Sequence, residues 1–313
     1  GQCRATNYLA LIKQGLKNAG LEHIPTIAIA LGEVYQNKQE GFRLPVFKIL
    51  NVVIHSFFFG DFLNQIFSAT VVREKEKGKS RQLFDFYMDE ARKIVLENKP
   101  EKFFKLLENT VSDFNSLEIE DKKLEKVGLI GEIFVKYNSY GQAHITDWLR
   151  EQGIEVEMPP MRDFFMQAFI NQVVNRENGM NRINRLMLKL FPLFYRILNN
   201  RLKKFEKIAQ QSRFNIPHEN IFEIAEHAKK IIDLANQFGE GWLLAGEVAG
   251  FAQRGVSRIV CVQPFGCIAN HIVAKGIERR LKQFYPEMNL LYLDIDGGLA
   301  EVNLHNRLEF LLT

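Results

Sequence analysis

The sequence predicts an α/β protein built on a parallel β-sheet with large helical insertions. Three short apolar segments rich in β-branched residues predict buried strands at 127–135, 257–262 and 289–293. Each is followed by a segment with apolar residues at helical spacing. This alternation of strand and helix is typical of parallel sheets, because the helix returns the chain to the starting edge of the sheet.

The N-terminal region, residues 1–120, is predicted to be mostly helical with one buried strand. Residues 6–19 have helical spacing, and the apolar, β-branched segment 24–31 predicts a parallel strand. Residues 45–115 return to helical spacing. The charged segment 73–80 interrupts them and is either a loop or a solvated helix end.

Residues 121–313 are predicted to form the parallel α/β domain. The first strand, a helix at 141–153 and a short strand at 154–158 make a βαβ unit. A helical excursion follows at 161–212, and Pro192 is expected to kink its basic amphipathic helix.

The rest of the chain alternates again between helices and strands. Helices are predicted at 219–238, 239–255, 267–284 and 299–312, around the last two strands. A sheet of this kind is expected to be Rossmann-like or flavodoxin-like.

Composition limits the function classes. Of 313 residues, 46% are hydrophobic, and 41 basic side chains oppose 37 acidic ones without a basic block, so we expect no nucleic-acid partner. The most apolar window, 47–67, contains charged and amide residues, so we expect no membrane partner. Three cysteines indicate a reducing, cytoplasmic location. Because residue 1 is Gly and Cys3 lies near it, the chain reads as a fragment of a longer protein.

Two cysteines occupy similar places in the predicted structure. Cys267 follows a buried strand through a Pro-Phe-Gly turn and opens a helix, and Cys3 also lies just before a helix. Helix N-termini stabilise thiolates, so the pair suggests a metal or redox centre such as an iron–sulfur cluster. The alternative is that both are small buried apolar residues. Cys261, inside a strand, is expected to be structural.

Other motifs are absent or have simpler explanations. The sequence has no GxGxxG, GxxxxGK[ST], HExxH or GxSxG motif. Asp294 and Asp296 could bind a cation, but a polar turn also explains them. The pair Glu223 and His227 fits a helix surface. The basic helix 182–204 could meet a membrane or an acidic partner, and a solvated helix face is the simpler interpretation.

Several stretches together resemble a known family. They are GQCRATNYLALIKQGLKNAG, VGLIGEIFVKYNSYGQAHITDWL, GEGWLLAGE, VQPFGCIANHIVAKG and LDIDGGLAEVN. They are similar to the D-component family of 2-hydroxyacyl-CoA dehydratases, in particular to the dehydratase-like C-terminal part of large CoA-substrate-specific enzyme activases. In those proteins an ATP-hydrolysing activator is fused to such a module. The similarity extends from residue 1 to about residue 306.

The resemblance implies a 4Fe–4S cluster between α/β domains, with Cys3 and Cys267 as ligands, because they match the Gly-x-Cys-Arg and Gln-Pro-Phe-Gly-Cys segments of the family. Cys261 matches no ligand. A further cysteine usually precedes the first segment, so the fragment alone is expected to bind a cluster poorly or not at all. The sequence around Arg73 lacks the Arg-Pro-Tyr-Glu pattern expected for contact with a CoA substrate.

The resemblance also implies a function. In the family, an electron delivered by the ATP-driven activator starts dehydration through a ketyl radical of the acyl-CoA. We therefore expect an iron–sulfur redox module that works with an activator ATPase domain in the same full-length chain, with an acyl-CoA as possible substrate. If active, it would be a dehydratase-like lyase or a low-potential reductase. The alternative is a non-catalytic docking or electron-acceptor module for the activator domain.

Overall fold

The computed structural model describes residues 5–26, 45–180, 185–214, 216, 219–298 and 300–313. They belong to two units, Gly1–Ile49 and Leu50–Thr313, which we describe separately. In the first unit, α1 (Ala5–Asn18) confirms the predicted helix at 6–19. The strand predicted at 24–31 lies mostly outside the described residues.

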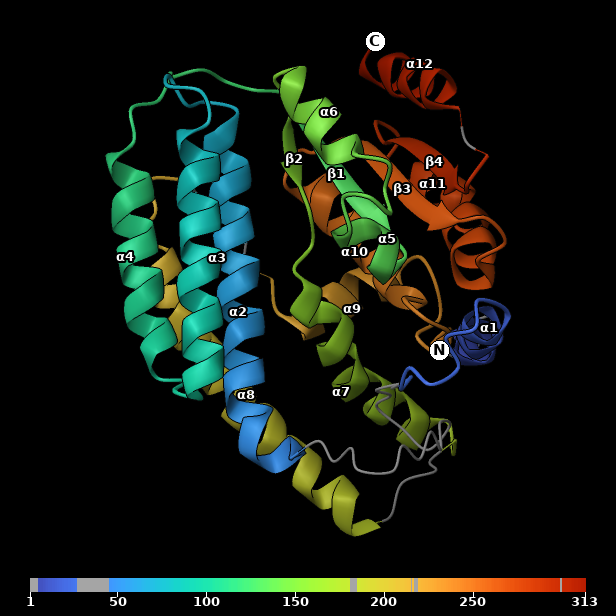
Figure 1. Ribbon diagram of the computed structural model, residues 1–313. Helices are drawn as coiled ribbons and strands as arrows, with labels where there is room; N and C mark the ends of the chain where they lie inside the picture. Colours follow the sequence, from blue (N-terminus) through green and yellow to red (C-terminus); the bar gives the residue numbers. More distant parts are fainter. Residues whose placement is uncertain (1–4, 27–44, 181–184, 215, 217–218, 299) are drawn as a thin grey trace. The chain divides into compact units, whose positions relative to one another are not determined.

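The second unit contains one parallel sheet (Figure 1). Its strands are β1 (Lys126–Gly131), β2 (Glu155–Glu157), β3 (Arg258–Pro264) and β4 (Asn289–Ile295), in the order β2-β1-β3-β4. Every neighbouring pair is parallel. The predicted α/β class with a parallel sheet is therefore confirmed.

Helices cover both faces of this sheet. On one face, leucines and isoleucines of α6 (Ile145–Glu151) and α12 (Glu301–Leu312) form a core with the strands. On the other face lies α10 (Trp242–Gln253), and its Phe251 ring packs against Gly128 of β1. Gly128 leaves the space that this aromatic ring fills, because a Cβ there would approach the ring closely.

The strand predicted at 127–135 is too long, because β1 ends at Gly131 and a short helix, α5 (Ile133–Tyr137), follows. Gly131 has a φ of 129°, and a Cβ there would collide with the carbonyl group of Val262 on β3. The Glu132 side chain then accepts a hydrogen bond from the Val135 N–H group and caps the helix. The apolar residues after Gly131 thus turn away from the sheet.

Other predicted helices begin later or end earlier than expected. The helix at 141–153 begins only at Ile145, because Ala143 and His144 have left-handed backbones. The helix at 239–255 is α10. The helix at 219–238 is the shorter α9 (Ile221–Lys229). The helix at 267–284 is divided into the π-helix η1 (Ala269–Ala274) and α11 (Glu278–Phe284).

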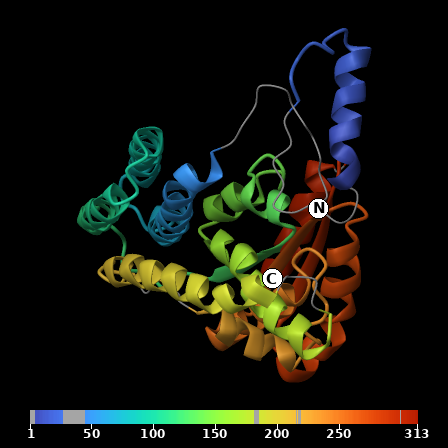
Figure 2. The same cartoon turned by 90° about the horizontal axis from the view of Figure 1, so that it is seen from below.

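The remaining long helices lie beside the sheet. They are α2 (Val46–Val71), α3 (Lys79–Glu97), α4 (Lys102–Ser116), α7 (Met161–Glu177) and α8 (Arg185–Ala209). Figure 2 shows α8 running from the side of α4 toward α7, and it contacts both. Phe205 of α8 is fully buried against the rings of Phe62 and Phe104. The segment predicted as a loop or helix end at 73–80 is a loop up to Gly78, in which the Glu74 carboxylate accepts from backbone N–H groups.

Among the described residues, α2 is long and apolar enough to cross a membrane by length and composition. Twelve of its residues are buried in the structure, including the polar residues His55 and Asp61. Buried core helices of soluble proteins pass the same test, so the expectation of no membrane partner stays a prediction.

Candidate functional site

The carboxyl edge of the sheet carries the residue that the sequence singled out. From β1 the chain crosses to β2 on one side, and from β3 it crosses to β4 on the other side. The chain therefore diverges between the neighbouring strands β1 and β3. In open parallel sheets ligands bind at such a switch point, outside the carboxyl ends of the strands. Cys267 lies at this point, in the turn that follows β3.

A tight turn presents Cys267 at the edge. Gly266 has a φ of 72°, and the Cys267 N–H group donates to the carbonyl oxygen of Pro264 at 3.1 Å. Cys267 is half-buried, and Phe265 beside it is 62% exposed. Helical backbone begins at Ile268 and continues as η1. Short π-helices are rare and are frequent at functional sites.

Asn270 connects the thiol to the buried interior. Its side-chain nitrogen Nδ2 lies 3.2 Å from Cys267 Sγ and 3.4 Å from Glu240 Oε2. Asn270 is fully buried, and its Oδ1 atom has no hydrogen-bond donor. Glu240 in turn accepts the N–H group of Ile133 at 2.8 Å. A buried carboxylate therefore links the segments that follow β1 and β3, and burial raises its pKa.

A second polar group lies at the end of β4. Asp294 Oδ1 accepts a hydrogen bond from Gln263 Nε2 at 2.7 Å and lies 2.6 Å from His271 Nε2. Lys275 Nζ lies 3.6 Å from the other oxygen of Asp294. Burial raises the pKa of Asp294, but the hydrogen bonds from Gln263 and His271 outweigh it and lower the pKa overall. Asp294 thus acts as an anchor for the η1 segment.

The structure places the other predicted residues as follows. Cys3 lies outside the described residues, so its distance from Cys267 stays a prediction. Cys261 is 1% exposed inside β3, as expected of a structural residue, and burial raises the pKa of its thiol. Asp296 is exposed, and its side chain accepts a hydrogen bond from the Gly298 N–H group. This contact agrees with the interpretation of Asp296 as part of a polar turn. Glu223 forms a capping box with Asn220 at the start of α9.

Among the described residues, one accessible thiol is available to bind a cluster. Cys267 fits as a ligand because it is half-buried at the edge and an amide donates a hydrogen bond to its sulfur, a contact by which proteins tune iron–sulfur clusters. Cys261 does not fit, because it is enclosed by the sheet. Within the described ranges, no group of three or more His, Cys, Asp or Glu side chains is arranged to hold a metal. A cluster would therefore need further thiolates, Cys3 among them.

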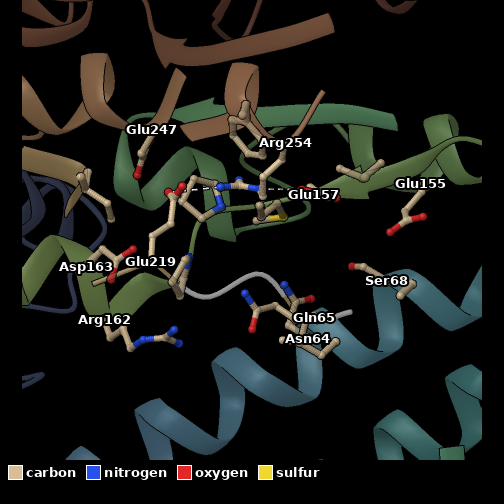
Figure 3. A pocket seen from close by; sticks show the side chains of 18 residues that line it. Asn64, Gln65, Ser68, Glu155, Glu157, Arg162, Asp163, Glu219, Glu247 and Arg254 are labelled. Carbon is tan, nitrogen blue, oxygen red and sulfur yellow. Dashed lines mark ion pairs between the residues drawn. The ribbon is translucent and has the colours of Figure 1, made fainter. Parts of the chain in front are cut away.

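A polar cavity that the sequence did not predict lies beside β2 (Figure 3). It has a volume of about 60 Å³, enough for a few water molecules. Side chains of α2, the segment after β2, α7 and α10 line it. Its labelled polar residues are Asn64, Gln65, Ser68, Glu155, Glu157, Arg162, Asp163, Glu219, Glu247 and Arg254.

Several charged side chains that line this cavity are almost fully buried. Glu247 and Lys136 form an ion pair at 3.1 Å, with side chains 2% and 4% exposed. Asp163 is 4% exposed, and burial raises its pKa to about 7. Glu247 is one of the nearby carboxylates that raise it further. Arg254 contacts both Glu219 and Glu157, as the dashed lines in Figure 3 show.

Several oxygens that line the cavity have no hydrogen-bond donor. They are Gln65 Oε1, Glu157 Oε2 and Glu247 Oε2. Buried oxygens of this kind are usually satisfied by ordered water. With Asp163 titrating near neutral pH, the cavity can hold or release a proton, but its residues come from distant parts of the chain and form no known motif.

Comparisons with protein-family models, with curated proteins and with solved structures gave no match for this chain.

Proposed function

We propose that this protein is the iron–sulfur-binding redox module of an ATP-dependent 2-hydroxyacyl-CoA dehydratase-like or reductase system. The observation that carries the proposal is the position of Cys267. Its half-buried thiol follows β3 at the switch point of a parallel sheet and accepts a hydrogen bond from the buried Asn270. Hydrogen bonds to cysteine sulfur and partial solvent exposure are the properties by which proteins tune iron–sulfur clusters.

The strand order supports the finer fold assignment that belongs to this proposal. The order β2-β1-β3-β4 coincides with the first four strands of the flavodoxin-like order 2-1-3-4-5. In such folds a cofactor lies between the strands that correspond to β1 and β3. A Rossmann-like or flavodoxin-like domain would therefore hold its cofactor next to Cys267.

In the proposed module, a 4Fe–4S cluster supplies low-potential one-electron transfer. Cys267 and Cys3 bind iron, and further thiolates come from outside these residues. Asn270 orients the Cys267 sulfur and, through Glu240, ties it to the segment after β1. The proposed partner is an ATP-hydrolysing activator domain in the cytoplasm, and an acyl-CoA is the proposed substrate class.

Iron and acid-labile sulfide test the proposal. Both are measured, with the visible absorption spectrum, on the anaerobically purified full-length protein and on its Cys267→Ser variant. We expect about four iron atoms and four sulfides per cluster in the parent protein and a clear loss in the variant. The Cys261→Ser variant is the matched control and should keep the iron content of the parent.

One observation favours the alternative function, a non-catalytic docking or electron-acceptor module for an activator ATPase domain. The described residues offer a single accessible thiol at the sheet edge, and a cubane cluster needs four protein ligands. If the full-length protein contains neither iron nor sulfide, the docking function replaces the redox function. Binding of the separately produced activator domain would then be measured directly.

A further inference from the structure

A second, much larger hollow lies between the helices α2 and α3 and the segment that runs from α5 to the start of α7. Its volume is about 740 Å³, within the range of small-molecule sites. Most of its surface is apolar. The apolar residues that line it include Phe57, Phe84, Met88, Val95, Met158 and Met161. We call this hollow the α2–α3 groove.

Gly60 leaves the floor of the groove open. It lies inside the long helix α2, where glycine is less favourable than any residue except proline. A Cβ at Gly60 would meet no atom within 4 Å, and its backbone is not left-handed. Neither close packing nor backbone conformation therefore requires glycine here. What its missing side chain provides is space in the groove that Gly60 lines.

Three guanidinium groups reach the same groove. Arg81 and Arg150 lie over the ring of Phe67, at 4.6 and 5.0 Å from its centre. Arg150 is 12% exposed, and its Nε atom is buried without a hydrogen-bond acceptor. Arg92 lines the groove, and no ion pair or hydrogen bond joins its side chain to a described residue. The buried charged donor without a full set of partners is thus the guanidinium of Arg150, and Gln65 Oε1 is a buried groove oxygen without a donor.

The carboxylates of the groove do not balance these charges. Asp61 is fully used, because it accepts the N–H groups of Met161 and Arg162 and lies against the Arg162 guanidinium. Asp147 is shared between Arg81 and Arg150, at 3.8 and 3.3 Å. Asp89 also lines the groove, on the same helix as Arg92, and offsets its charge. Arg81 and Arg150 share the single carboxylate of Asp147, so among the described residues one positive charge is left over at their end of the groove.

We propose that the α2–α3 groove binds a monocarboxylic acid with an extended apolar body. The apolar body lies over Gly60 and the Phe and Met side chains, and the carboxylate lies at Arg81 and Arg150, beside the ring of Phe67. A single excess positive charge fits one carboxylate better than a polyphosphate. This site is separate from Cys267 and does not depend on the proposed redox function.

Three simple ligands distinguish the chemistry that the groove selects. Isothermal titration calorimetry is carried out with decanoate, with decyltrimethylammonium and with acetate. Decanoate should bind at least about tenfold more tightly than either of the others, because only decanoate has both an apolar body and a negative charge. Equal binding of decanoate and decyltrimethylammonium would mean unspecific adsorption and would overturn the proposal, as would the absence of decanoate binding.

Two variants locate the site. Gly60→Leu fills the floor of the groove without a backbone penalty, because leucine favours helices more than glycine does. It should abolish decanoate binding. Gly276→Leu is the matched control, because Gly276 also has open space at its Cβ position but does not line the groove. If both variants bind decanoate like the parent protein, the proposed place is wrong.

Arg81→Gln tests the charge. It should weaken decanoate binding about tenfold, the usual loss for a hydrogen bond to a charged group. Arg279→Gln, on the exposed surface of α11, is the control and should not change the affinity. Circular dichroism spectra establish that each variant is folded. The iron content of the protein should be the same in all four variants. Failure of this proposal can therefore be distinguished from failure of the proposed redox function.

Discussion

The carboxyl edge around Cys267 and the polar cavity around Glu247 are both built from charged and polar side chains, but they differ in solvent access. At the edge, the ion pair of Lys275 and Asp294 is 43% and 34% exposed. Glu247, which lines the cavity, forms an ion pair with Lys136, and these two side chains are 2% and 4% exposed. The same type of contact is therefore made in a high-dielectric environment at the edge and in a low-dielectric one in the cavity.

This difference decides what each place can do. Exposed groups gain little from pairing but remain available to a ligand. Buried groups depend strongly on each other, because an unpaired buried charge is costly. We therefore expect changes at the edge to affect reactivity with little effect on stability, and changes in the cavity to affect stability and its pH dependence.

The largest expected effect comes from breaking the buried ion pair. Lys136→Ala leaves the Glu247 carboxylate buried without its partner, so we expect the free energy of unfolding to fall by about 3–5 kcal/mol. His271→Ala removes one of the hydrogen-bond partners of Asp294 at the edge, and we expect a loss of about 1 kcal/mol or less. Urea unfolding at pH 7 measures both.

A double variant shows whether charge is the cause. Lys136→Met combined with Glu247→Leu removes both charges and keeps apolar volume, so it should cost less than Lys136→Ala alone. If His271→Ala destabilises the protein as strongly as Lys136→Ala does, the contrast between edge and cavity is wrong.

The next effect is the pH dependence that Asp163 gives to stability. Burial raises the folded-state pKa of Asp163 to about 7, above its ordinary value of 3.8. Between these values the folded protein binds more protons than the unfolded chain, so the contribution of Asp163 to stability falls as pH rises from about 4 to about 7. Asp163→Asn cannot ionise. It should be more stable than the parent protein at pH 8, by on the order of 3 kcal/mol, and equally stable near pH 4.

Urea unfolding of both proteins at pH 4, 6 and 8 measures this difference. A difference that does not change with pH would show that Asp163 is ionised in the folded state throughout this range, and that the cavity is more hydrated than its burial indicates.

The sequence predicts the edge because the relevant residues are close together in the chain. Strand, turn, Cys267 and the following helix lie within residues 257–284, and apolar periodicity is a local signal. The cavity has no such signal. Asn64, Glu157 and Glu247 come from α2, the end of β2 and α10, and only the packing of these elements brings them together. A buried Glu in an apolar helix such as α10 is the one indication that the sequence offers.

The errors in element length have local causes that periodicity does not reveal. The pattern of apolar residues continues from 127 to 135, but Gly131 turns the backbone because β3 approaches too closely for a Cβ atom. The sequence at 267–284 has uninterrupted helical spacing. In the structure, a π-helical turn brings the Asn270 amide to the sulfur of Cys267. Such departures depend on tertiary contacts, which override local propensity.

Asp294 should give the opposite pH dependence, with a smaller amplitude. Its folded-state pKa is lowered, since hydrogen bonds from Gln263 and His271 outweigh the effect of burial, which raises it. Its stabilising contribution is therefore present above pH 4 and is lost as pH falls through the lowered pKa. Asp294→Asn should be less stable than the parent protein at pH 7, and the difference should shrink below about pH 4. Urea unfolding over this range measures it, and a difference that grows toward low pH would contradict the assignment.

The smallest effect on stability, and the most specific test of the edge, concerns the thiol of Cys267. Asn270 donates to its sulfur at 3.2 Å and holds the half-buried thiol in place at the edge. Iodoacetamide at pH 7.5 should alkylate Cys267 at least about tenfold faster than Cys261, because reaction requires an accessible sulfur, and Asn270→Ala should change the rate of Cys267 alone. Mass spectrometry of peptides reports each cysteine separately. Cys261, buried in β3, is the internal control and should stay unmodified while the protein is folded. If Cys261 reacts as fast as Cys267 in the folded parent protein, the two thiols do not differ in access. An unchanged Cys267 rate in Asn270→Ala would show that the amide positions the η1 backbone and does not act on the sulfur.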